Sequence, residues 1–171
     1  MNRFIKLTTA ATAALALLSA PALAASEPTV KEVNVTAQVT NLDSNAQEFY
    51  PNIAHDILTE ITNIMPLTHD QQGFVIDVVV QNVSLDGNSV LPDSREFNQI
   101  EGVMSIRAQD TNANSESFPI KVVAQGAGVA TPEGFAVVEP STTDFYQALI
   151  AGFAREVAER EPEVMPMASS K

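Results

Sequence analysis

The chain has 171 residues, a formal net charge of −12 at pH 7 and no cysteine. The lack of cysteine excludes disulfide bonds, zinc–thiolate sites, thiol catalysis and lipid attachment through cysteine. The acidic balance argues against binding to nucleic acid or to anionic lipid headgroups, and it favours basic partners or cations.

Residues 1–24 have the three parts of a secretory signal peptide. Arg3 and Lys6 form a positively charged start, an alanine-rich apolar run extends from Leu7 to Leu18, and Ala22-Leu23-Ala24 is an A-x-A cleavage site. The apolar run is shorter than the about 20 residues that a membrane-spanning helix needs. We therefore expect cleavage after Ala24 and a periplasmic protein without a stable membrane anchor.

A strand and a helix are predicted first in the mature chain. The segment VKEVNVTAQV, residues 30–39, places valine or alanine at every second position from Val33 onward, which predicts a half-buried strand. Isoleucines then recur at helical spacing over residues 50–65, together with Phe49. Pro51 fits the first turn of a helix and Pro66 stops it, so this segment predicts a helix.

The strongest strand is predicted over residues 73–87. Phe74, Ile76, Val78 and Val80 share one face, but the apolar positions change phase at Gln81–Asn82. A β-bulge at these two residues is the simplest cause. Asp86-Gly87 then predicts a turn.

Two further strands are predicted over residues 100–109 and 118–124, because apolar and polar positions alternate in both. The short polar loop between them predicts an antiparallel hairpin. A long connection containing glycine and proline follows, in which Val137 and Val138 predict a short edge strand.

The last element is a predicted helix that begins at a cap formed by Ser141 or Thr142, with Asp144 in the first turn. Its buried stripe is predicted to contain Phe145, Leu149, Phe153 and Val157. We expect the helix to end at Pro162. A single domain over residues 25–161 is then followed by a disordered tail, residues 162–171.

The order β-α-β-β-β-α predicts the α+β class, as a two-layer sandwich with a mainly antiparallel sheet and two helices on one face. The other sheet face combines polar side chains with a few valines, so it is a candidate interaction face. Asp77 lies between Ile76 and Val78 in the most apolar strand, where it could be partly buried. Because an unpaired buried charge is costly, we favour instead that it points to solvent on this face or pairs with an arginine, for which Arg107 is a candidate. The residues predicted for the face are Val75, Asp77, Val79, Val103, Arg107 and Gln109.

The sequence predicts no catalytic, cofactor-binding or metal-binding residues. His55, Asp56 and Glu60 lie within about one helical turn, but His55 and Asp56 point about 100° apart, which is typical of a solvated polar face. Asp110, Asn112 and Asn114 begin like a calcium-binding loop, but Lys121 stands at the position of the bidentate glutamate. No G-x-S-x-G motif surrounds a serine, so we expect a protein that is not an enzyme and has no cofactor.

The signal peptide, the strand VNVTAQV, the helix NIAHDILTEI, the long strand FVIDVVVQNVSL and the final helix FYQALIAGFAREVAE together resemble small periplasmic α+β proteins of Gram-negative cell envelopes. These include the auxiliary lipoproteins of ABC transport and related uncharacterised families. The resemblance is one of order and hydrophobic pattern. Members often have a lipidated cysteine at the cleavage site, and this chain lacks it.

The leading hypothesis is a soluble periplasmic protein-interaction or envelope-accessory module, with another envelope protein or a second copy of itself as partner. An alternative is a module that binds a small ligand or a cation, with residues 126–140 as a lid. A more distant alternative is an unrecognised hydrolase.

Overall fold

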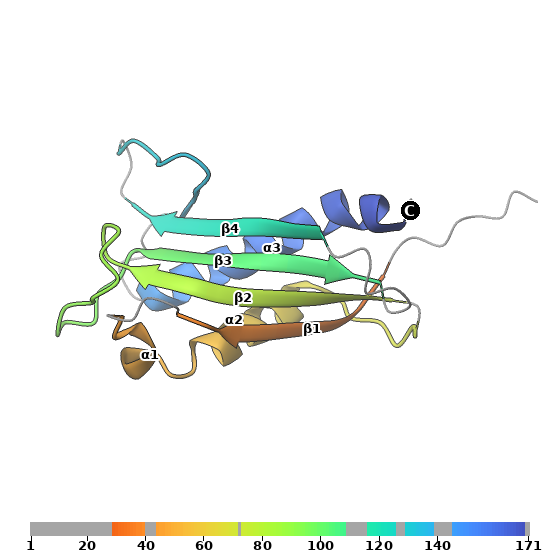
Figure 1. The fold of residues 1–171 in the computed structure, drawn as a ribbon, viewed down its shortest axis with the longest axis horizontal. Helices are drawn as coiled ribbons and strands as arrows, with labels where there is room; N and C mark the ends of the chain where they lie inside the picture. Colours follow the sequence, from red (N-terminus) through yellow and green to blue (C-terminus); the bar gives the residue numbers. More distant parts are fainter. Residues whose placement is uncertain are drawn as a thin grey trace, which may run out of the picture.

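The computed structural model describes residues 29–39, 44–71, 73–108, 116–125, 129–138 and 145–169, and the side chains of the last helix as far as residue 161. Within these residues, a five-stranded sheet and three helices confirm the predicted α+β class (Figure 1). In chain order, the elements are β1 (Val30–Ala37), α1 (Ala46–Phe49), α2 (Ile53–Ile64), β2 (Phe74–Ser84), β3 (Gln99–Arg107), β4 (Glu116–Ala124), β5 (Ala136–Val138) and α3 (Phe145–Ser169).

The sheet has the strand order β1-β2-β3-β4-β5 and is mixed. Strands β2, β3 and β4 pair antiparallel, and the predicted hairpin of β3 and β4 is confirmed. However, β1 pairs with β2 in parallel and β4 pairs with β5 in parallel, so the prediction of a mainly antiparallel sheet is wrong. The physical reason at β1 is that α2 carries the chain back along the sheet, so that β2 starts at the same end as β1.

The bulge and the turn predicted for β2 are both confirmed. The pairing of β2 with β3 shifts register between Val80 and Asn82, so one extra residue of β2 is accommodated there. Beyond the strand end, Leu85 and Asn88 form an isolated antiparallel bridge. Asp86 and Gly87 between them have φ angles of 50° and 83°, which is the conformation of a tight two-residue turn.

The core lies between the helices and one face of the sheet. Figure 1 shows α2 and α3 behind the strands, and the two helices contact each other as well as the sheet. Phe153 of α3 is fully buried and packs over Gly102 of β3, where a Cβ atom would lie 3.0 Å from the ring and 2.6 Å from the carbonyl oxygen of Val79. The residues of β2, β3 and β4 in this core are Phe74, Ile76, Val78, Val80, Val83, Ile100, Met104, Ile106, Ile120, Val122 and Ala124.

The predicted stripes of the helices are confirmed in their middles and wrong at their ends. Leu149, Phe153 and Val157 are fully buried, whereas Phe145 is 40 % exposed at the start of α3. In the same way, Ile64 at the end of α2 is 49 % exposed. Both residues lie at helix ends.

The helix boundaries also differ from the prediction. Helix α2 lies within the predicted range 50–65, but it begins later, at Ile53, because Pro51 lies in a turn between α1 and α2, and it ends at Ile64. At the other end of the chain, α3 continues past Pro162 to Ser169. A proline inside a helix removes one N–H and its ring clashes with the carbonyl group four residues earlier, which is why an end was predicted there, but the helical backbone of α3 continues through Pro162. The predicted cap at Ser141 or Thr142, and Asp144, lie outside the described residues.

Candidate interaction face

The side chains that alternate with the core residues point to the opposite side of the sheet, and no described helix lies in front of that side in Figure 1. We call this side the polar face. The strand register sorts its side chains into rows that cross the sheet. Its members on the four long strands are Glu32, Asn34, Thr36, Val75, Asp77, Val79, Asn82, Ser84, Gln99, Glu101, Val103, Ser105, Arg107, Ser117, Pro119, Lys121 and Val123.

The central row of the polar face is mainly apolar. Thr36 of β1 lies opposite Val79, Val79 lies opposite Val103, and Val103 lies opposite Pro119 of β4. Val79 and Val103 are half-buried, and Thr36 and Pro119 are exposed. The row therefore presents methyl and ring groups across four strands to the solvent.

An ion pair flanks this row on one side. Arg107 Nε lies 2.8 Å from Asp77 Oδ2, so of the placements considered for Asp77 the structure has the pair with Arg107. Asn34, the register partner of Asp77 on β1, donates a hydrogen bond of 3.1 Å from Nδ2 to the other carboxylate oxygen. The hydrogen bond and the charge of Asp77 raise the pKa of Arg107, and the charge of Glu32 adds to this effect.

A second ion pair flanks the row on the other side. Lys121 Nζ lies 3.0 Å from Glu101 Oε2, and Asn82 Nδ2 donates a hydrogen bond of 3.0 Å to Glu101 Oε1. Burial raises the pKa of Glu101, but Asn82 and Lys121 outweigh it, so the pKa lies below its ordinary value. The Lys121 ammonium also lies 5.2 Å from the ring centroid of Phe135, within the range of a cation–π contact.

One polar atom of this cluster, next to the bulge of β2, has no hydrogen-bond partner among the described residues. Asn82 Oδ1 is buried and accepts no hydrogen bond from the described residues, whereas Asn82 Nδ2 donates a hydrogen bond to Glu101. Ser84 and Gln99, the next register pair, are joined by a hydrogen bond of 3.0 Å. Asn82 Nδ2 also lies 3.4 Å from Ser84 Oγ, so the Lys121–Glu101 ion pair belongs to a connected polar network.

The structure brings together five of the six residues predicted for the face. Asp77, Val79, Val103 and Arg107 are partly exposed, whereas Val75 is only 2 % exposed and is flanked in register by Glu32 and Arg107. Long side chains on both neighbours explain why a valine on this side of the sheet is buried, and Val75 offers no surface to a partner.

The sixth predicted residue, Gln109, lies outside the described residues. The polar face also contains four residues that were not predicted for it from the sequence: Thr36, Pro119, Glu101 and Lys121. Their signal was present, since each stands at the polar phase of a predicted strand, but only the register between strands shows that they share rows with Val79 and Asp77.

The other sequence candidates for chemistry are dispersed. His55 is exposed on α2, and Asp56 accepts a hydrogen bond of 2.5 Å from the Tyr146 hydroxyl group of α3. Across the described ranges, no group of three or more histidine, aspartate or glutamate side chains is placed to hold a metal ion. Residues 110–114 of the calcium-like loop are not among the described residues, and the same holds for residues 126–128 and 139–140 of the segment expected to act as a lid.

Comparison with protein-family models finds no match to this chain, and comparison with curated protein sequences finds no significant match. In the part of the chain that the structure describes, none of the helices is both long and apolar enough to span a bilayer.

Proposed function

We propose that this chain is a soluble, non-enzymatic periplasmic protein that binds another envelope protein through the polar face. The observation that carries the proposal is the row of Thr36, Val79, Val103 and Pro119 between two ion-paired clusters. An apolar centre with a hydrated polar rim is the usual anatomy of a protein–protein interface. The apolar row would supply the buried contact, and the flanking clusters would set the orientation of the partner.

The arrangement of the domain supports this assignment. In the proposal, the sheet and the helices form a two-layer sandwich, with the core between the layers and the polar face left for the partner. The resemblance of the sequence to small α+β proteins of the cell envelope and its signal-peptide pattern support the compartment. The lack of a catalytic motif in the sequence supports a binding role rather than an enzymatic one.

The nature of the partner follows from charge. The chain carries 21 acidic and 9 basic residues, so two copies repel each other at long range. We therefore favour a different protein with a basic surface around an apolar contact. Self-association is the competing outcome that the experiment below distinguishes.

The test replaces the apolar centre of the polar face by charge. The double variant Val79→Lys and Val103→Lys is compared with a control variant that carries Val90→Lys and Val129→Lys, two exposed valines outside the strands. Tagged mature protein is crosslinked in the periplasm, purified and analysed by mass spectrometry, and its mass in solution is measured by sedimentation.

We expect the wild type and the control variant to capture the same envelope protein and the polar-face variant to lose it, with all three proteins folded by circular dichroism. Capture that is unchanged in the polar-face variant would show that the face is not the contact. If the wild type forms a dimer and the polar-face variant does not, the partner at this face is a second copy of the chain rather than a different protein.

A further inference from the structure

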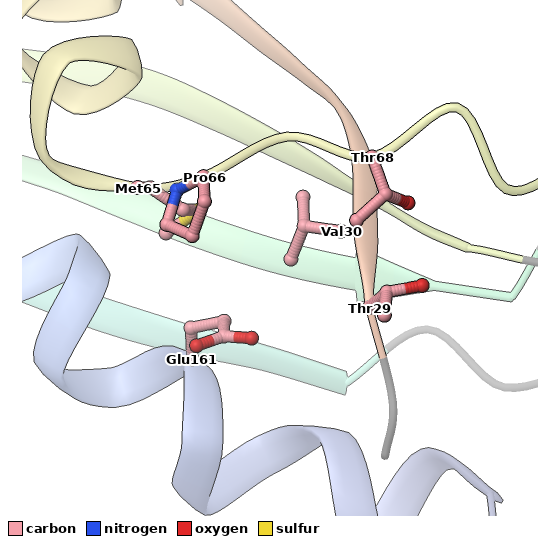
Figure 2. A pocket seen from close by; sticks show the side chains of 6 residues that line it. All are labelled: Thr29, Val30, Met65, Pro66, Thr68 and Glu161. Atoms are coloured by element: carbon pink, nitrogen blue, oxygen red, sulfur yellow. The ribbon is translucent and has the colours of Figure 1, made fainter. Parts of the chain in front are cut away.

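A cavity of about 170 Å³ lies on the helix side of the sheet, away from the polar face. It opens where β1 begins, where α2 has ended and where α3 passes both, as Figure 2 shows. Its lining consists of Thr29, Val30, Met65, Pro66, Thr68 and Glu161. These residues come from three segments that are far apart in the sequence, so the cavity is a product of the tertiary fold.

The lining of the cavity combines an apolar wall with two threonines and one charged side chain, Glu161. Val30 and Met65 are 3 % and 5 % exposed and form its apolar wall, and Pro66 adds a further hydrocarbon surface. In Figure 2 the two threonine hydroxyl groups point away from Glu161, whereas the Glu161 side chain extends into the gap between α3 and Val30. A ligand in this cavity would therefore contact hydrocarbon along its length and a carboxylate at one point.

The Glu161 carboxylate lacks a compensating charge within the described part of the chain. Burial is the one cause that shifts its pKa, and it raises the pKa above the ordinary value. The adjacent Arg160 is directed to Glu156, with 3.9 Å between Nε and Oε2. A bound cation would offset this partial desolvation of the carboxylate.

We propose that this cavity binds an aliphatic primary ammonium group, with the alkyl chain against Val30 and Met65 and the ammonium group on the Glu161 carboxylate. A primary ammonium is a compact charge on a flexible hydrocarbon stem, which matches a small apolar cavity with a single acidic group. The net charge of −12 adds a long-range attraction for cations. The same chemistry occurs in a free alkylamine and in a lysine side chain of another polypeptide.

The experiment follows the methyl resonances of Val30 and Met65 in ¹H–¹³C NMR spectra while a probe is added to the full mature chain. The probes are n-butylammonium, 1-butanol as its neutral counterpart, and N-acetyl-lysine-N-methylamide as a lysine side chain within a peptide. Glu161→Gln removes the proposed contact. Glu159→Gln removes one negative charge from an exposed position on the same helix and is the matched control.

We expect saturable shifts of both methyl groups with n-butylammonium, about tenfold weaker binding of 1-butanol, and a loss of about tenfold in affinity in Glu161→Gln but less than twofold in Glu159→Gln. Binding of the blocked lysine as tight as that of n-butylammonium would identify a lysine side chain as the source, and much weaker binding would identify a free amine. The proposal is overturned if neither cation shifts the two methyl groups, if 1-butanol binds as tightly as the cations, or if the two glutamine variants lose affinity equally. Because the readout uses no partner protein, its result is independent of the interaction proposed for the polar face.

Discussion

The two faces of one sheet are built from the same strands and have opposite properties. On the helix side, Ile76, Met104 and Ile120 belong to a continuous buried core, whereas on the polar face their sequence neighbours Asp77, Ser105 and Lys121 are partly exposed. The alternation of a strand is enough to produce this difference. Within one strand, the residues that pack in the core therefore alternate with residues that are exposed on the polar face. Each group can be substituted separately.

The largest expected difference in stability is between two variants, each of which truncates one side chain on one side of the sheet. Phe153→Ala removes a fully buried ring and uncovers Gly102, and we expect it to lower the free energy of unfolding by about 3–5 kcal/mol. Val79→Ala removes half-exposed methyl groups from the polar face, and we expect a loss of about 1 kcal/mol or less. Urea unfolding followed by circular dichroism measures both. Equal losses of stability in the two variants would mean that side chains on the polar face stabilise the fold as strongly as those on the helix side.

A smaller effect is expected from the ion pair on the polar face. The side chains of Arg107 and Asp77 are 39 % and 31 % exposed, so a double-mutant cycle of Arg107→Gln and Asp77→Asn is expected to give a coupling energy of about 0.5–1 kcal/mol. The corresponding cycle for Arg160 and Glu156, whose charged atoms are 3.9 Å apart, serves as the control and is expected to give less. A coupling energy above about 2 kcal/mol at the first pair would contradict its description as a solvent-screened contact.

The smallest expected effect is on the pH dependence of stability, to which Glu101 on the polar face and Glu161 on the helix side contribute with opposite signs. Glu101 has a lowered pKa on the polar face, so its ionised form stabilises the fold above the ordinary pKa of 4.5, and this contribution is lost as the pH falls through the lower pKa of the folded state. Glu161 has a raised pKa on the helix side, so its ionisation opposes folding, and this penalty disappears as the pH falls.

Urea midpoints at pH 7 and near pH 3.5 for Glu101→Gln and Glu161→Gln measure this difference. We expect Glu101→Gln to be less stable than the wild type at pH 7 and to approach it in acid. We expect Glu161→Gln to be at least as stable as the wild type at pH 7. Stability differences of the same sign for both variants at pH 7 would contradict the opposite directions of the two pKa shifts.

The sequence predicted those features of the fold that depend on neighbouring residues. The phase change at Gln81–Asn82, the turn at Asp86-Gly87 and the hairpin of β3 and β4 all follow from local spacing, and the structure confirms each of them. Arg107 was considered as a partner of Asp77 because an unpaired buried charge is costly, and the structure contains this pair.

What the sequence did not predict depends on contacts between distant segments. The parallel pairing of β1 with β2 is set by the return of the chain through α2, and alternation carries no information on strand direction. Val75 looked like a partner-facing valine, but its register neighbours Glu32 and Arg107 were unknown. Glu161 stood in the sequence as one acidic residue among several near a helix end, and only its juxtaposition with Val30 and Met65 creates a cavity.

Pro119 has a consequence beyond its place in the apolar row. Strand β5 covers only Val122–Ala124 of β4, so the part of β4 that contains Pro119 has a strand neighbour on one side within the described residues. A strand with an unpaired side is a template on which further chains add and grow into fibrils, and proline interrupts this growth because it lacks an N–H to donate. Pro119 therefore protects the unpaired side of β4 against the addition of further strands.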